Sequence, residues 1–115
     1  MKPEEIAEIT EAEIVFCSPA WCGLDITTGC SSDLMSDILT LDVNNALLIT
    51  GLANEQVIRT AEMADIHTII FVRSKVPTRR MLELAEESGI SLMRTRHTMF
   101  TVCGLLMNAG LKSPY

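Results

Sequence analysis

The stretch Ala46-Leu47-Leu48-Ile49-Thr50 is an unbroken run of apolar and β-branched residues, and Gly51 ends it. Such a run is typical of a strand that is covered on both faces, as strands of parallel sheets are. Residues 68–72 and 90–93 have the same character. A segment with helical periodicity follows each of these runs, so the sequence predicts parallel βαβ units with right-handed crossovers.

Capping residues and glycines set the expected helix ends. Asn54, Thr78 and Thr98 are expected to begin helices that end near Ala64, Ser88 and Ala109. Before the first buried run, the sequence predicts a short exposed helix over 3–12, strands over 13–16 and 26–31, a loop over 17–23, and a helix over 34–39 capped by Asp33.

The length of 115 residues, with 48% hydrophobic and 21% charged residues, fits one packed domain. We expect a single α/β domain over 1–115 with a mostly parallel sheet flanked by helices. Its parts are an N-terminal helix, strand and loop (1–23), a core (24–110) and a tail (111–115). The first 31 residues are expected to form a small β-rich lid or edge.

No apolar run reaches the roughly 20 residues of a membrane span, and the acidic N-terminus lacks the apolar stretch of a signal peptide. We therefore expect a cytoplasmic protein that does not contact a membrane and whose cysteines are reduced.

Charge is distributed unevenly along the chain. Residues 1–42 carry nine acidic residues and one lysine, whereas residues 43–115 carry six acidic and eight basic residues. The total of −6 argues against nucleic-acid binding, which needs a basic surface. Six of the nine Lys and Arg residues lie between Arg73 and Arg96. This local basic excess points to a small anionic ligand.

In an open α/β sheet, ligands bind beyond the carboxyl ends of the strands. We therefore predict a surface for a nucleotide- or phosphate-sized anion at the loops that follow the strands. The predicted residues are Thr28, Gly29, Thr50, Gly51, Arg73 and Arg96. The alternative is a solvated basic rim, or one that pairs with the chain's own acidic half.

The last predicted helix carries apolar residues around most of its circumference, which is typical of a buried helix. A chain of this size does not easily bury such a helix alone. We predict a two-fold homodimer with Met99, Leu106 and Met107 in the interface. Alternatively, the acidic N-terminal segment covers the remaining face.

Known catalytic and metal-binding motifs are not evident. Cys17 and Cys22 are separated by four residues and thus do not form a CxxC pair, and no histidine lies at zinc-finger spacing. The sequence also has no P-loop and no GxSxG elbow. We therefore expect no metal, no cofactor, no catalytic residue and no enzymatic activity. A redox or enzymatic role for Cys22 or Cys30 would require a markedly acidic thiol.

The segments Thr28-Gly29, Ser32-Asp33-Leu34-Met35-Ser36-Asp37-Ile38-Leu39 and Leu48-Ile49-Thr50-Gly51 resemble the DRTGG domain family. Residues 81–90 and 98–101 also fit its pattern, so the resemblance runs from about Asp25 to Leu106. Ile26 stands where the family motif has its arginine and Cys30 where it has its second glycine, so no role of that arginine carries over.

The resemblance implies an α/β fold, a homodimer and a regulatory role without catalysis, as in the DRTGG domains beside CBS domains of regulated pyrophosphatases. A ligand-sensing regulatory module is our first hypothesis. The second is an interaction subunit that docks on a larger enzyme through its Met-rich helix without a ligand. The third is the cysteine-based redox or enzymatic protein.

Overall fold

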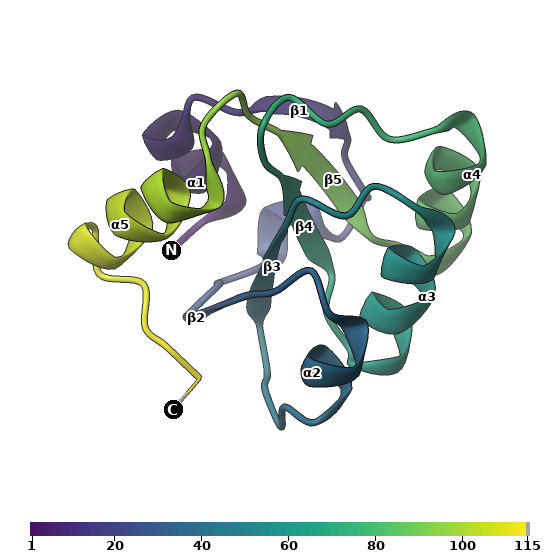
Figure 1. Cartoon of the computed structure of the whole chain (residues 1–115), viewed down its shortest axis with the longest axis horizontal. Helices are drawn as coiled ribbons and strands as arrows, with labels where there is room; N and C mark the ends of the chain where they lie inside the picture. The colour runs from purple at the N-terminus through teal and green to yellow at the C-terminus, as the bar shows by residue number, and fades with distance from the viewer. Residues whose placement is uncertain (115) are drawn as a thin grey trace.

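A five-stranded sheet runs through the middle of the molecule, with helices on both faces (Figure 1). The structure is a computed structural model that describes residues 1–114, apart from the side chain of Cys22. The strands are β1 (Glu13–Phe16), β2 (Thr28–Ser31), β3 (Ala46–Thr50), β4 (Thr68–Phe71) and β5 (Ser91–Arg94), in the spatial order β1-β5-β4-β3-β2.

Strands β2, β3, β4 and β5 are parallel, and β1 joins the sheet as an antiparallel edge strand beside β5. Every residue of β3 and β4 is buried, which explains their unbroken apolar sequences. The predicted mostly parallel α/β sheet is thus confirmed. The first 31 residues of the chain supply both edge strands, β1 and β2. Strand β2 begins at Thr28, two residues later than predicted.

Five α-helices cover the sheet. They are α1 (Pro3–Thr10), α2 (Met35–Leu39), α3 (Glu55–Met63), α4 (Arg79–Ser88) and α5 (Met99–Asn108), and a 3-10 turn, η1 (Trp21–Gly23), lies in the predicted loop. Helices α2, α3 and α4 pack side by side on one face, and α1 and α5 pack on the other (Figure 1). No helix within residues 1–114 is long and apolar enough to cross a membrane.

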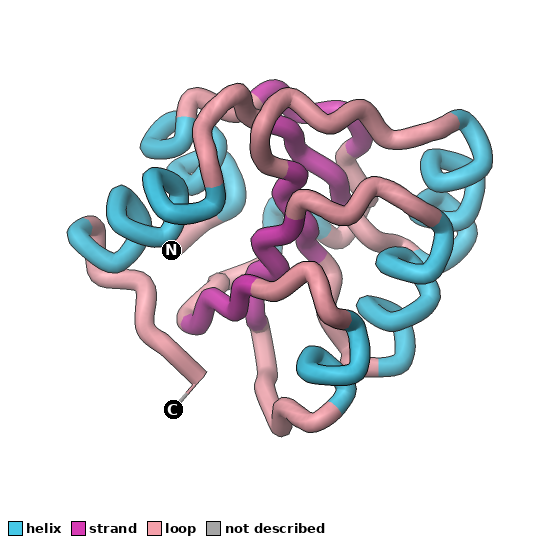
Figure 2. The backbone as a smooth tube through the Cα atoms, in the orientation of Figure 1, coloured by secondary structure: helices cyan, strands magenta, loops and turns pink. Residues whose placement is uncertain are grey.

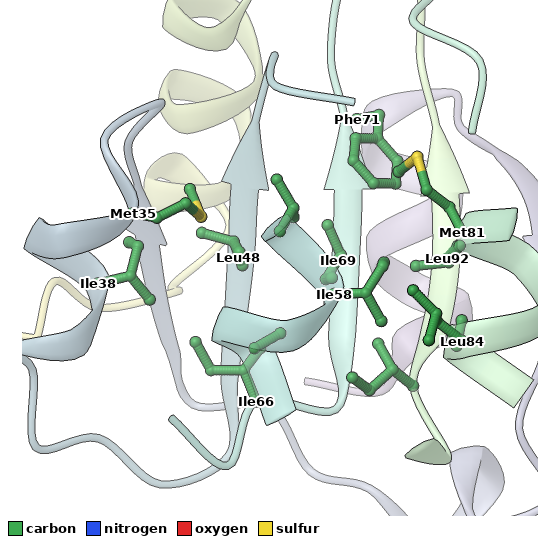
Figure 3. Close-up of a cluster of buried hydrophobic side chains, with 14 of the residues drawn as sticks. Met35, Ile38, Leu48, Ile58, Ile66, Ile69, Phe71, Met81, Leu84 and Leu92 are labelled. Atoms are coloured by element: carbon green, nitrogen blue, oxygen red, sulfur yellow. The ribbon is translucent and has the colours of Figure 1, made fainter. Parts of the chain in front are cut away.

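The sheet separates two apolar clusters. The larger lies under α2, α3 and α4 and includes Ile58, Ile69, Phe71 and Leu92 (Figure 3). The second lies under α1 and α5, where Trp21 closes one side and donates its indole N–H to Glu4 Oε1 over 2.8 Å. Because side chains alternate along a strand, neighbouring residues of β3 and β4 enter opposite clusters.

The predicted caps of the three long helices are confirmed: Asn54, Thr78 and Thr98 each accept the backbone N–H three residues ahead. The predicted cap of α2 was wrong. Leu34 occupies the N-cap position there, while the Asp33 carboxylate accepts a hydrogen bond from the Gly51 N–H instead. The Asp33 side chain therefore binds the backbone at the end of β3 instead of the first turn of α2, where the local sequence placed it.

Helix α5 is not buried all round. Leu106 and Val102 pack into the second cluster, and α1 lies beside the helix. The outward face is uncovered: Phe100 is 90% exposed and Met107 65% exposed. The N-terminal segment thus covers part of α5, as the alternative interpretation expected, and leaves one apolar stripe open.

The chain after α5 returns to the sheet beside β2. Lys112 forms a parallel bridge with Thr28, and Leu111 is buried against Gly29, where an added Cβ would lie 2.7 Å from the leucine Cδ2. Gly29 therefore makes room for a core side chain.

We expect Gly29→Ala to destabilise the fold by about 1–3 kcal/mol, because the new methyl group overlaps Leu111. Urea unfolding of the single variant and of Gly29→Ala/Leu111→Ala measures the effect. The double variant should lose less than the sum of the two single changes. Additive losses would contradict the contact. Gly23→Ala, at a position with open space, is the matched control.

Candidate functional site

The loops after β3, β4 and β5 lie along one edge of the sheet, because the three strands are parallel (Figure 2). Helices α3, α4 and α5 begin directly after these loops, so their N-terminal ends lie at the same edge. The N-terminal end of a helix carries a partial positive charge and favours anions. We call this the carboxyl edge.

The first cluster at the carboxyl edge joins the end of β2 to the end of β3. Asp33 Oδ1 accepts hydrogen bonds from Gly51 N at 2.7 Å and from Thr50 Oγ1 at 3.0 Å. Thr50 Oγ1 in turn accepts the Leu52 N–H at 3.1 Å. Thr50 is buried, and its hydroxyl is used within the loop. It therefore positions the loop that an incoming ligand would meet.

The β4–α4 loop starts with an unusual turn. Arg73 and Ser74 have φ angles of 55° and 58°, and Lys75 N donates to Val72 O over 3.3 Å. Two left-handed residues in succession define a type I′ turn, which normally contains Asn and Gly. The neighbouring loop holds this conformation, since Arg73 N donates to His97 O and Ser74 N to Thr95 O, both over 2.8 Å.

The turn places the Arg73 side chain over Gly51. Arg73 Nη2 lies 3.1 Å from the point where a Cβ of residue 51 would be, and the Asp33 carboxylate oxygens lie 3.5 and 3.6 Å from it. A side chain at position 51 would thus crowd the guanidinium. Within residues 1–114, no carboxylate oxygen lies within 4 Å of the side-chain nitrogens of Arg73, Lys75 or Arg79, so these three cations form no ion pair.

Other cations of the basic segment are paired. Arg80 contacts two glutamates, and Arg94 binds Glu13 and two loop carbonyls. Arg96 Nη2 lies 3.8 Å from Glu11 Oε2, beyond the end of α1. For Arg94 and Arg96, the interpretation that the basic half pairs with the acidic N-terminal half is therefore correct.

Of the six residues predicted for the ligand surface, the structure brings together Thr50, Gly51 and Arg73. It does not bring Thr28 and Gly29 to them, since both lie at the amino end of β2 beside the tail. Asp33, which joins Thr50 and Gly51, was not among the predicted ligand-surface residues. The sequence did contain a signal, because Asp33 comes two residues after the predicted strand 26–31, and the loops that follow parallel strands lie next to one another.

The cysteines give no support for a reactive thiol at Cys30. Burial raises the pKa of the Cys30 thiol to about 11, and its Sγ donates to Leu47 O. Such a thiol is a poor nucleophile at neutral pH. The side chain of Cys22 lies outside the described part of the structure. Among described residues, no three His, Cys, Asp or Glu side chains are grouped so that they could hold a metal ion.

The sequence matches no protein-family model and no curated protein. The structure does match a solved one, the CBS and DRTGG domains of the regulatory region of Clostridium perfringens pyrophosphatase, which was crystallised with its activator diadenosine tetraphosphate. The TM-score is 0.75 at 15% identity, over 99% of this chain and 49% of that chain.

This chain has a DRTGG-like fold. The resemblance seen in the sequence is therefore confirmed in three dimensions, although the identity is too low to transfer more than the fold. The DRTGG-like chain spans about half the length of the regulatory region that it matches. The activator belongs to that longer protein.

The ion pair at the end of the carboxyl edge can be tested by titration. A hydrogen bond from His97 and the charges of Arg96 and His97 lower the pKa of Glu11 below its ordinary 4.5. The pair therefore stabilises the fold above the unfolded pKa, and this contribution is lost as the pH falls through the lower folded pKa.

We expect an NMR titration to give Glu11 a pKa below 4.5, and to give a value closer to 4.5 in His97→Ala. His67→Ala is the matched control, since His67 contacts Asp65 instead. An unchanged Glu11 pKa in His97→Ala would show that the contact is absent in solution.

Proposed function

We propose that this DRTGG-like domain is a non-catalytic regulatory module that senses a small anionic ligand at the carboxyl edge. The observation that carries the proposal is Arg73, an unpaired cation held in a left-handed turn that costs free energy. Residues in such conformations cost about 1–3 kcal/mol each and are concentrated at functional sites. A glycine would fit this turn better, so the arginine side chain has a use there.

Three further features support an anion beside Arg73. Gly51 has no side chain, so the Arg73 guanidinium can lie close to the backbone at the end of β3, where ligands bind in open α/β sheets. Lys75 and Arg79 add unpaired positive charge, and α4 begins nearby without an acidic residue in its first turn. The fold neighbour, a regulatory region that was crystallised with a nucleotide activator, is consistent with sensing.

The test separates stability from binding. We expect Arg73→Gly to raise the stability by about 1 kcal/mol, because glycine relieves the turn. The same variant should bind nucleotides or acyl phosphates at least about tenfold more weakly, because a charge-assisted hydrogen bond is lost. Urea unfolding and calorimetry measure the two effects.

Arg96→Gly is the matched control, since it removes the same charge from a cation that is paired with Glu11. It should leave the affinity nearly unchanged. Equal affinity of Arg73→Gly and the unmodified chain, or no binding of any probe at millimolar concentration, would refute the ligand-sensing role.

We propose a homodimer as the second part of this function, formed through other residues of α5 than the sequence predicted. Leu106 is only 1% exposed and Met99 is half-buried, so neither is freely available to a partner. The open face of α5 instead carries Phe100, Gly104 and Met107, spaced to lie on one side of the helix. We call these three residues the α5 stripe.

Gly104 favours a second copy of the chain as the occupant of this stripe. A Cβ at Gly104 would meet nothing within 4 Å among the described residues, so no contact within residues 1–114 requires a glycine there. Glycine inside a helix costs about 1 kcal/mol relative to alanine. In a two-fold contact, Phe100 of each copy would fill the gap over the other copy's Gly104.

We expect Gly104→Ala to stabilise the monomer by about 1 kcal/mol and yet to weaken the dimer. Phe100→Asp should abolish the dimer. Light scattering and unfolding at low and high concentration measure both effects, and Met63→Asp is the control, because Met63 is an exposed apolar side chain (68%) on the opposite face. An unmodified chain that stays monomeric at its highest soluble concentration would refute the dimer and favour docking on a larger enzyme.

A further inference from the structure

A groove lies along the free edge of β2 and is separate from the anion site. Its volume is about 380 Å³, in the range of small-molecule pockets. Its lining residues come from α2 and the segment after it, from α5 and from the tail. Figure 1 shows α2 and α5 on opposite faces of the sheet at this edge. Of the residues predicted to bind a ligand, Gly29 alone lines it.

The tail begins a sixth strand beside β2 but does not complete it. Gly29 N donates to Lys112 O over 2.8 Å, and Lys112 N donates to Thr27 O over 3.2 Å. In a parallel ladder, the next donor would be the N–H of residue 114, which should reach the Gly29 carbonyl. Residue 114 is a proline and has no N–H. The Gly29 carbonyl therefore receives no hydrogen bond from residue 114, and within residues 1–114 the Ser31 N–H makes no hydrogen bond to the Pro114 carbonyl either.

Backbone hydrogen-bonding groups of β2 after Gly29 have no partner in the tail within residues 1–114. Ser32 N donates to Ile49 O of β3, whereas Gly29 N points away from β3 toward the tail. Because backbone groups alternate in direction along a strand, the N–H and the carbonyl of Ser31 point outward, as Gly29 does. Residues 1–114 offer the outward N–H of Ser31 no partner. The floor of the groove thus presents one donor, the Ser31 N–H, between two acceptors, the carbonyls of Gly29 and Ser31.

The groove walls suit a flat ring. Ile38 and Leu41 line it from the α2 side, and Cys103 and Met107 line it from the α5 side. Sulfur atoms make favourable contacts with aromatic rings. The two charged side chains that line the groove, Asp37 and Lys112, carry opposite charges. This balance favours a neutral ligand over the anion expected at the carboxyl edge.

We propose that the groove binds a neutral heteroaromatic ring of the nucleobase class. One ring edge pairs its acceptor with the Ser31 N–H and its amino donor with a carbonyl of Gly29 or Ser31. Adenine has such an edge, with a ring nitrogen next to the N6 amino group. The groove is then a second site, independent of Arg73.

Alkylation of Cys103 reports on the groove. The test uses the full chain carrying Cys17→Ser and Cys22→Ser. Cys30 is buried and its thiol has a raised pKa, so Cys103 is then the cysteine that reacts with the alkylating agent. We expect adenosine to slow alkylation of Cys103 by about tenfold at saturation, since a ring in the groove covers the thiol. Purine riboside, which lacks the amino group, should protect much less.

Two variants assign the effect to the groove. Ser31→Pro removes the outward N–H and leaves the ladder to β3 intact, a substitution that edge strands tolerate. It should raise the dissociation constant for adenosine about tenfold. Cys103→Met fills the groove from the opposite wall and should also weaken binding, as measured by ligand-observed NMR. This second variant keeps the test valid if Ser31→Pro does not fold.

Arg73→Ala separates the two sites, since it should leave adenosine binding unchanged. The alkylation is repeated with Phe100→Asp, so that a second copy packed over Met107 cannot account for protection of Cys103. Lack of protection by adenosine, or equal protection by purine riboside, would overturn the proposal. Loss of adenosine binding in Arg73→Ala would also overturn it and would move the ligand to the carboxyl edge.

Discussion

The parallel pairing of β2, β3, β4 and β5 is the constraint on which the rest of the molecule depends. Successive parallel strands are joined by crossovers, so α3 follows β3 and α4 follows β4, and both begin at the same edge as α5, which follows β5. That edge therefore gathers loop backbone, helix N-termini and basic side chains from segments far apart in the sequence. The buried faces of β3 and β4 fix the register on which this convergence depends.

Two residues at the carboxyl edge illustrate how this framework accommodates unfavourable local choices. Asp33 leaves the N-terminus of α2 without a side-chain cap in order to hold the end of β3. Arg73 adopts a left-handed turn that glycine would fill at lower cost, and the carbonyls of the β5–α5 loop hold it there. Such locally unfavourable choices persist only where the surrounding structure holds them, as these contacts do.

The free edge of β2 and the open face of α5 are the two surfaces that the fold leaves incomplete. An edge strand with unpaired backbone groups is a template for further pairing, and the tail covers only its first residues. The exposed Phe100 lies on a helix whose other side is packed against α1 and the sheet. The proposed ring-binding groove and the proposed dimer contact use these two surfaces.

The sequence by itself determined the secondary structure, the caps at Asn54, Thr78 and Thr98, and the parallel arrangement, because apolar runs and capping hydrogen bonds are local or periodic properties. It also predicted the loops that hold Thr50, Gly51 and Arg73. Only the tertiary structure decided that Asp33 joins that site, that Arg96 pairs with Glu11, that Gly29 packs under Leu111, and that Leu106 is buried while Phe100 is exposed. These outcomes depend on which distant segments meet, and contacts of that kind leave no periodic signal in a single chain.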